Sequence, residues 1–193
     1  MASSQLVINC SANGFTQTLA DAGSTTNWKF PVVYTPAPGS PPAEVAEITI
    51  DNDPPTTLVT GMQGQTVTGT GSAVVLSVEL GATSQAIKIA SNPNNVPDCT
   101  NELISSYSAD DSFDYFQIAC SSQTTTWNLS VTLTIETDPE LSPPTVSLIT
   151  NGTTSQSVPV GGPNPFTASG TTLAFQIFGL QGISTVEITY SFN

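Results

Sequence analysis

The sequence contains no histidine and no arginine, and its only basic side chains are Lys29 and Lys88. Without histidine, the chain builds no Ser-His-Asp or Cys-His pair, no histidine-bound metal and no imidazole general base. Without arginine, it also lacks the usual bidentate clamp for carboxylate and phosphate groups. Because these absences exclude most common enzyme mechanisms, we predict that the chain is not an enzyme.

Charged residues of either sign are scarce, and most of them are acidic. Charged residues make up 9% of the chain and give a formal net charge of -13, whereas an ordinary soluble domain carries about a quarter of its residues as charged side chains. Proteins that bind nucleic acid or anionic membranes need clustered Lys or Arg to neutralise phosphates. We therefore expect no nucleic-acid partner.

Long apolar runs are also missing. No run approaches the length of a membrane span, so we expect no membrane insertion. The first residues also lack the charged start and apolar core of a secretory signal peptide. We therefore expect a soluble protein.

The sequence does contain repeated alternation of apolar and polar residues, which is typical of half-buried β-strands. The clearest cases are residues 127–135, 74–80 and 186–192. Weaker runs predict further strands, and no segment has a convincing helical period. These weaker runs are residues 5–10, 15–19, 28–34, 45–51, 85–90, 115–120, 145–150 and 173–178.

Strands separated by Gly, Pro, Asn and Ser predict an all-β fold, an antiparallel β-sandwich of the jelly-roll or Ig-like kind, with Pro-rich loops and little or no helix. We expect one domain over residues 1–193, since all-β domains commonly reach this size. A boundary near residues 138–144 is the less favoured alternative, because the piece after it holds few strands. Residues 70–81 and 168–179 look alike, which duplication and recurrent turn chemistry explain equally well.

Cysteine is sparse, and its three copies, Cys10, Cys99 and Cys120, lack the CxxC spacing of a zinc site. Cys99 lies in a turn-rich stretch and Cys120 ends an apolar run. Cys99 and Cys120 therefore form the preferred disulfide if the compartment is oxidising. Three free thiols are the alternative.

Two acidic stretches offer the hard oxygen ligands that Ca²⁺ prefers. Asp51 and Asp53 follow a predicted strand, and Asp110, Asp111 and Asp114 precede another. Neither stretch matches an EF-hand loop, and Asp is also a common turn residue because its side chain bonds nearby backbone groups. These five residues are the candidate ligands for Ca²⁺; we expect no other cofactor.

Carboxylate and lysine chemistry survive the missing residue types. A glycosidase needs only two carboxylates, but its sugar cleft needs aromatic platforms, and Trp28, Trp127 and Tyr190 fall on predicted core faces. A lysine nucleophile needs a lowered pKa, whereas Lys29 and Lys88 alternate with apolar neighbours and so point outward. We disfavour both mechanisms.

The remaining hypothesis is a structural or interaction protein, a β-sandwich that decorates or builds a larger assembly such as a virion surface, a cell-surface layer or an extracellular filament. Its partners are then other proteins or copies of itself, and a virion or cell-surface location is favoured. Uncharged Thr and Ser on the polar strand faces pack laterally at little desolvation cost, which supports this hypothesis. The alternative is a calcium-assisted carbohydrate-binding module or lectin, for which a glycan is the partner.

Overall fold

The computed structural model describes residues 4–9, 13–39, 41–51, 53–60, 64–81, 86–91, 93, 103–108, 114–180 and 184–193. Within these ranges the chain is all-β, every strand pairing is antiparallel, and there is no helix, so none that could span a membrane. The all-β class predicted from the alternation is confirmed.

In the described part of the chain, twelve strands form one continuous sheet. Four of them, β2, β5, β8 and β11, are much longer than the others. In chain order the strands are β1 Ser4–Asn9, β2 Gly14–Pro36, β3 Val45–Ile50, β4 Thr56–Thr57, β5 Gln65–Glu79, β6 Ala86–Ser91, β7 Leu103–Ser108, β8 Asp114–Thr137, β9 Thr145–Thr150, β10 Thr154–Ser157, β11 Gly161–Phe178 and β12 Ser184–Phe192.

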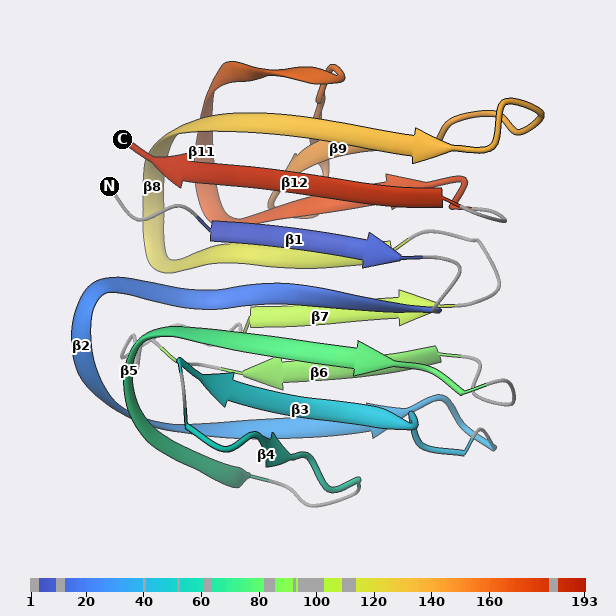
Figure 1. The fold of residues 1–193 in the computed structure, drawn as a ribbon. Helices are drawn as coiled ribbons and strands as arrows, with labels where there is room; N and C mark the ends of the chain where they lie inside the picture. Colours follow the sequence, from blue (N-terminus) through green and yellow to red (C-terminus); the bar gives the residue numbers. More distant parts are fainter. Residues whose placement is uncertain are drawn as a thin grey trace.

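The sheet folds over itself into two layers, because the long strands bend and pass from one layer to the other (Figure 1). We call these the front layer and the back layer. In order of pairing, the front layer contains the first part of β11, the second part of β8, then β12, β1, the first part of β2, the second part of β5, β3 and β4. The back layer contains β10, β9, the second part of β11, the first part of β8, then β7, β6, the second part of β2 and the first part of β5. The result resembles a β-sandwich, and the pairings do not single out a jelly-roll or Ig-like strand order.

The bends coincide with irregularities in the ladders, which is how strands commonly change sheets. The register between β2 and β5 shifts between Asp21 and Thr26, and that between β8 and β11 shifts between Gly170 and Thr172. At the first bend the buried Trp28 donates from Nε1 to the carbonyl of Gly71 at 2.9 Å. This bond fixes a core side chain at the turning point of the sheet.

The chain is an internal repeat of two interleaved halves, β1 to β6 and β7 to β12. Trp28 pairs with Gly69 in the first half, and Trp127 pairs with Ala168 in the second, so both partners shift equally along the sequence. The same shift relates β2 with β6 to β8 with β12. The pairing of β3 with β5 also matches that of β9 with β11, with β9 displaced by one further residue. Strands of the front layer in one half correspond to strands of the back layer in the other half.

The halves are not separate in space. β6 of the first half pairs with β7 of the second, and β12 of the second half pairs with β1 of the first. These contacts close a circuit of pairings that runs β1, β2, β6, β7, β8, β12 and back to β1. The likeness noted between residues 70–81 and 168–179 is part of this repeat.

The core lies between the layers and draws on both halves. Phe15 of the front layer meets Phe116 of the back layer edge-on, with ring centroids 4.9 Å apart. Phe175 and Tyr190 make a second edge-on pair at 5.5 Å. Since the long strands alternate buried and exposed side chains, each layer has one apolar inner face and one polar outer face.

Side-chain amides close the sheet edges. Gln65, on the edge strand of the back layer, accepts from the backbone N–H of Val59 at 2.8 Å and donates to the carbonyl of Thr57 at 2.9 Å. At the equivalent edge of the other layer, Asn164 donates to the carbonyls of Pro159 and Gly161 at 3.4 and 3.1 Å. Free strand edges invite pairing with other chains, and these bonds tie the segments that follow β4 and β10 to the edge strands β5 and β11.

Candidate functional site: a hollow on the front outer face

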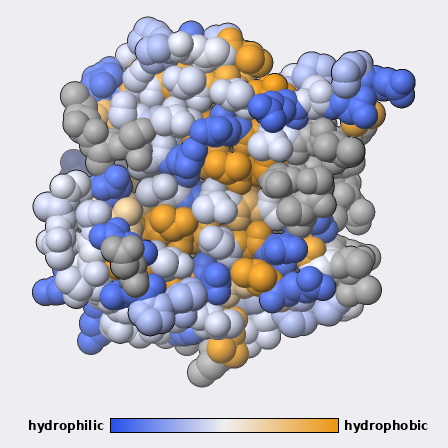
Figure 2. Space-filling view, in the orientation of Figure 1, coloured by the Kyte–Doolittle hydropathy of each residue, from blue (hydrophilic) through white to orange (hydrophobic). Residues whose placement is uncertain are grey.

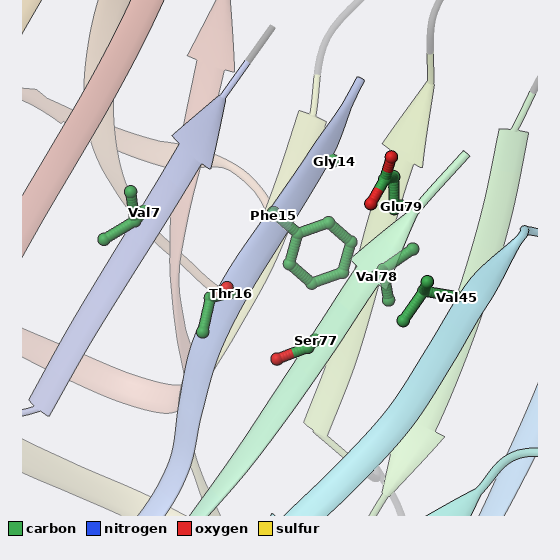
Figure 3. Close-up of a pocket in the computed structure, with 8 residues that line it drawn as sticks. All are labelled: Val7, Gly14, Phe15, Thr16, Val45, Ser77, Val78 and Glu79. Carbon is green, nitrogen blue, oxygen red and sulfur yellow. The ribbon is translucent and has the colours of Figure 1, made fainter. Parts of the chain in front are cut away.

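A depression lies on the outer face of the front layer, where β1, β2, β5 and β3 run side by side (Figure 3). It has a volume of about 300 Å³ and is open to solvent. We call it the front-face hollow. Its lining residues are Val7, Gly14, Phe15, Thr16, Val45, Ser77, Val78 and Glu79.

Strand register assembles this hollow from segments distant in sequence. Val7 lies opposite Thr16, Thr16 lies opposite Ser77, and Glu79 lies between Gly14 and Val45. Two valines therefore flank a centre of small residues, and one carboxylate stands beside them.

Gly14 is required by a close backbone approach. A Cβ atom at this position would lie 2.2 Å from the carbonyl oxygen of Val78, which is far inside van der Waals contact. The missing side chain leaves the floor open, and Phe15 and Val78, which are almost fully buried, form the apolar base beneath it.

The second half of the repeat carries larger side chains at positions equivalent to those of the hollow. At the equivalent places on the back layer, Tyr115 replaces Thr16 and Phe178 replaces Glu79. Tyr115 is partly buried, and burial raises the pKa of its hydroxyl. The front-face hollow exists because the first half carries small or charged residues where the second half carries aromatic rings.

The two outer faces also differ in charge among the described residues. The front face carries four carboxylates, whereas both lysines lie on the back layer and are exposed. Lys88 and Glu187 occupy equivalent positions of the repeat, so the exchange of layers reverses the charge there. The four front-face carboxylates are Glu47, Glu79, Glu136 and Glu187.

A second, shallower hollow of about 270 Å³ lies at the end of β8, on the same side of the front layer. It is lined by Glu136, Thr137, Asp138, Pro139 and Thr185. Thr185 pairs with Glu136 across the ladder. It also contains carboxylates and no aromatic ring, so it extends the acidic character of the front face.

Asp51 and Asp53 both cap the bend of β5. The Asp51 carboxylate accepts from the backbone N–H groups of Ser72 at 2.5 Å and Ala73 at 2.9 Å, and also from the Ser72 hydroxyl. The Ser72 backbone bond is the main reason that the pKa of Asp51 lies below its usual value, followed by the Ala73 bond. Asp53 accepts from the N–H of Thr70 at 3.0 Å. Backbone donors thus bond to both carboxylate oxygens of Asp51 and to one of Asp53.

Asp114 lies apart from that pair. It begins β8, opposite Ile177, and is buried, whereas Asp51 follows the end of β3 at the opposite side of the sheet (Figure 1). Asp110 and Asp111 lie outside the described residues. Within the described part of the chain, no three Asp, Glu or Cys side chains gather as a metal site, and the calcium hypothesis stays a prediction.

Cys120 lies in β8 and is disulfide-bonded. Cys10 and Cys99 both lie outside the described residues. The preferred pairing of Cys99 with Cys120 therefore stays a prediction.

The residues expected to be core or solvent-facing are placed as predicted. Trp28 and Tyr190 are buried, Trp127 packs against the core, and Lys29 and Lys88 are exposed. The hollow itself was missed, because no local pattern marks it.

Comparison with known proteins gives no relative from which a role could be transferred. No family model, curated protein or solved structure matches the chain.

Proposed function

We propose that this chain is a non-enzymatic structural or interaction protein, a subunit that decorates or builds a larger assembly such as a virion surface, a cell-surface layer or an extracellular filament. The front outer face is its contact surface. The observation that carries the proposal is the front-face hollow: a shallow depression on a broad polar strand face, backed by a continuous sheet.

The lining of the hollow favours contact over catalysis. Glu79 is its one titratable side chain, whereas paired-carboxylate hydrolysis needs two groups on either side of the bond. Phe15 is its one aromatic residue, and with 3% exposure it offers no platform for a sugar ring. The alternative of a calcium-assisted lectin gains no support from Asp51 and Asp53, which cap β5.

The sheet edges favour association through faces. Gln65 and Asn164 occupy edge backbone groups, and Pro163 and Pro165 lie on the edge part of β11, where proline offers no N–H donor. A partner therefore finds more accessible chemistry on the front face than along the edges. Figure 2 shows this face as a polar surface with scattered apolar patches, and non-obligate contact surfaces are about as apolar as the rest of a protein surface.

Sedimentation of the purified chain tests this proposal, over a range of protein and salt concentrations and with the particles or filaments isolated from its source. We expect either a mass above the monomer value of 20.0 kDa or co-sedimentation with those structures. A strictly monomeric protein at all concentrations, with no co-sedimentation, would overturn it.

A further inference from the structure

The walls and rim of the front-face hollow differ in chemistry. Val7 and Val45 lie at opposite sides of it, on β1 and β3, and the Glu79 carboxylate lies at the end of β5 (Figure 3). Side chains that combine an aliphatic stem with a charged tip bury the stem on apolar surface and keep the tip at a polar rim. Lys and Arg are the side chains with this form and with the charge opposite to Glu79.

The surroundings strengthen that choice. Glu187 lies opposite Val7, and Glu47 lies opposite Ser77, so a carboxylate flanks the hollow on each side along one row across the strands. Glu187 accepts a hydrogen bond from Gln5 at 2.6 Å, which holds its carboxylate on this face. Among the described residues no lysine lies on the front layer. Charge complementarity of this kind steers and orients a partner.

The hollow is of the size that protein side chains fill. On the back layer, the equivalent positions are occupied by Tyr115 and Phe178. Larger side chains thus stand there at the places that Thr16 and Glu79 hold on the front. A pocket of about 300 Å³ is at the small end of the range for small-molecule sites, so a protein side chain is the better match.

We propose that the front-face hollow docks one Lys or Arg side chain of a basic partner protein, with the stem on the apolar lining of the hollow and the charged tip at Glu79. This proposal rests on the proposed function and names the chemistry of the partner. A second copy of the chain is a poor occupant, because it brings only Lys29 and Lys88 and a net charge of -13, which repels another copy.

Titration of the full ¹⁵N-labelled chain with short blocked peptides tests the proposal. The probes are Gly-Arg-Gly and Gly-Lys-Gly, with Gly-citrulline-Gly and Gly-norleucine-Gly as neutral controls of similar shape. We expect saturable amide shifts confined to the strands around Val7, Thr16, Val45 and Ser77, with the cationic peptides only. Equal binding of the neutral peptides, or shifts spread over all acidic segments, would overturn the proposal.

Two variants locate the contact, each with a matched control. Glu79→Gln should weaken the cationic peptides by about fivefold, the scale of one exposed ion pair, whereas Glu140→Gln in the β8–β9 loop should not. Thr16→Tyr copies Tyr115 and should fill the hollow and abolish the shifts, whereas Thr68→Tyr on the exposed back-layer part of β5 should leave them. Amide dispersion shows whether each variant is folded, and unchanged binding to both test variants would overturn the proposal.

Spermidine distinguishes a free polyamine from a protein side chain. If it binds the hollow more tightly than either peptide and with the same dependence on Glu79, the commitment to a protein partner is wrong. Sedimentation separates the two proposals. If the chain co-sediments with the particles or filaments of its source and both test variants co-sediment as well as the parent, the docking proposal fails alone. Peptide binding without assembly or co-sedimentation counts against the proposed function alone.

Discussion

Asp51 and Asn151 occupy equivalent positions at the two bends of the sheet, and each caps the long strand beside it through a side-chain oxygen. Both have a left-handed backbone, with φ of 44° and 53°, a conformation that Asp and Asn tolerate better than most residues. Asn151 accepts from the N–H of Thr171 at 2.7 Å and of Thr172 at 3.3 Å, as Asp51 does from Ser72 and Ala73. Both halves of the repeat therefore use the same cap, which is charged in the first half only.

Replacing Asn151 by Ala should lower the free energy of unfolding by about 1–3 kcal/mol, because two backbone donors lose their acceptor and the left-handed conformation becomes strained. Asn151→Asp keeps an acceptor of the same shape and should stay within about 1 kcal/mol of the parent. Urea denaturation measures both. Equal stability of the alanine variant and the parent would show that the cap contributes nothing.

The charge on Asp51 makes stability depend on pH. Its pKa is lower in the folded chain, through the Ser72 and Ala73 hydrogen bonds, so the stabilisation is present above the unfolded pKa of about 3.9 and is lost as the pH falls through the folded value. Asp51→Asn should flatten the loss of stability below about pH 4. Thermal melts from pH 6 to pH 2 measure this, with Glu140→Gln as the control for removing one exposed carboxylate. If Asp51→Asn loses stability at low pH as steeply as the Glu140→Gln control, the prediction is wrong.

A buried glutamine offers a stabilising substitution. Gln17 donates from Nε2 to the carbonyl of Gln117 at 3.0 Å across the core, but Nε2 of Gln117 has no hydrogen-bond partner among the described residues. Since a buried unpaired donor costs about 1–3 kcal/mol, Gln117→Met should raise the free energy of unfolding by about 1 kcal/mol. Urea denaturation measures the difference, and a destabilised variant would mean that the Gln117 amide is satisfied in solution.

The disulfide partner of Cys120 can be assigned by mass spectrometry of the alkylated, non-reduced chain. We expect Cys99→Ser to leave Cys120 free to react with the alkylating agent, and Cys10→Ser to leave the bridge intact. The reverse pattern would assign the bridge to Cys10. Removing the bridge should cost about 2–4 kcal/mol of stability.

Much of the fold follows from local alternation, because buried strands carry their signal in every second residue. Strand β9 has the predicted bounds, and the alternating runs in β5, β8 and β12 lie where expected. Residues 15–19 and 28–34 belong to one bent strand, β2, because the polar stretch between them forms the bend. The sequence pattern did not predict β7 or the Thr-rich first part of β5. Both segments depend on pairing with distant strands, which the local sequence does not reveal.

The repeat and the hollow were harder to predict for the same reason. The local traces of the repeat are slight: a run of threonines shortly before Trp28 and before Trp127, and the likeness of residues 70–81 and 168–179. The hollow depends on register, which brings Val7, Thr16 and Ser77 into one row from three strands. Small side chains that are adjacent in space but far apart in sequence produce no local sequence pattern.

Carboxyl footprinting of the assembled protein shows whether the front face is the contact surface. Glu79 and Glu187 lie on the front face, whereas Asp53 lies in the loop after β3, where its carboxylate accepts from the N–H of Thr70. In the particles or filaments of the source, we predict that carbodiimide labelling of Glu79 and Glu187 falls relative to the free chain, while labelling of Asp53 stays the same. Unchanged labelling of Glu79 and Glu187 in the assembled state would contradict the claim that the front face is the contact surface.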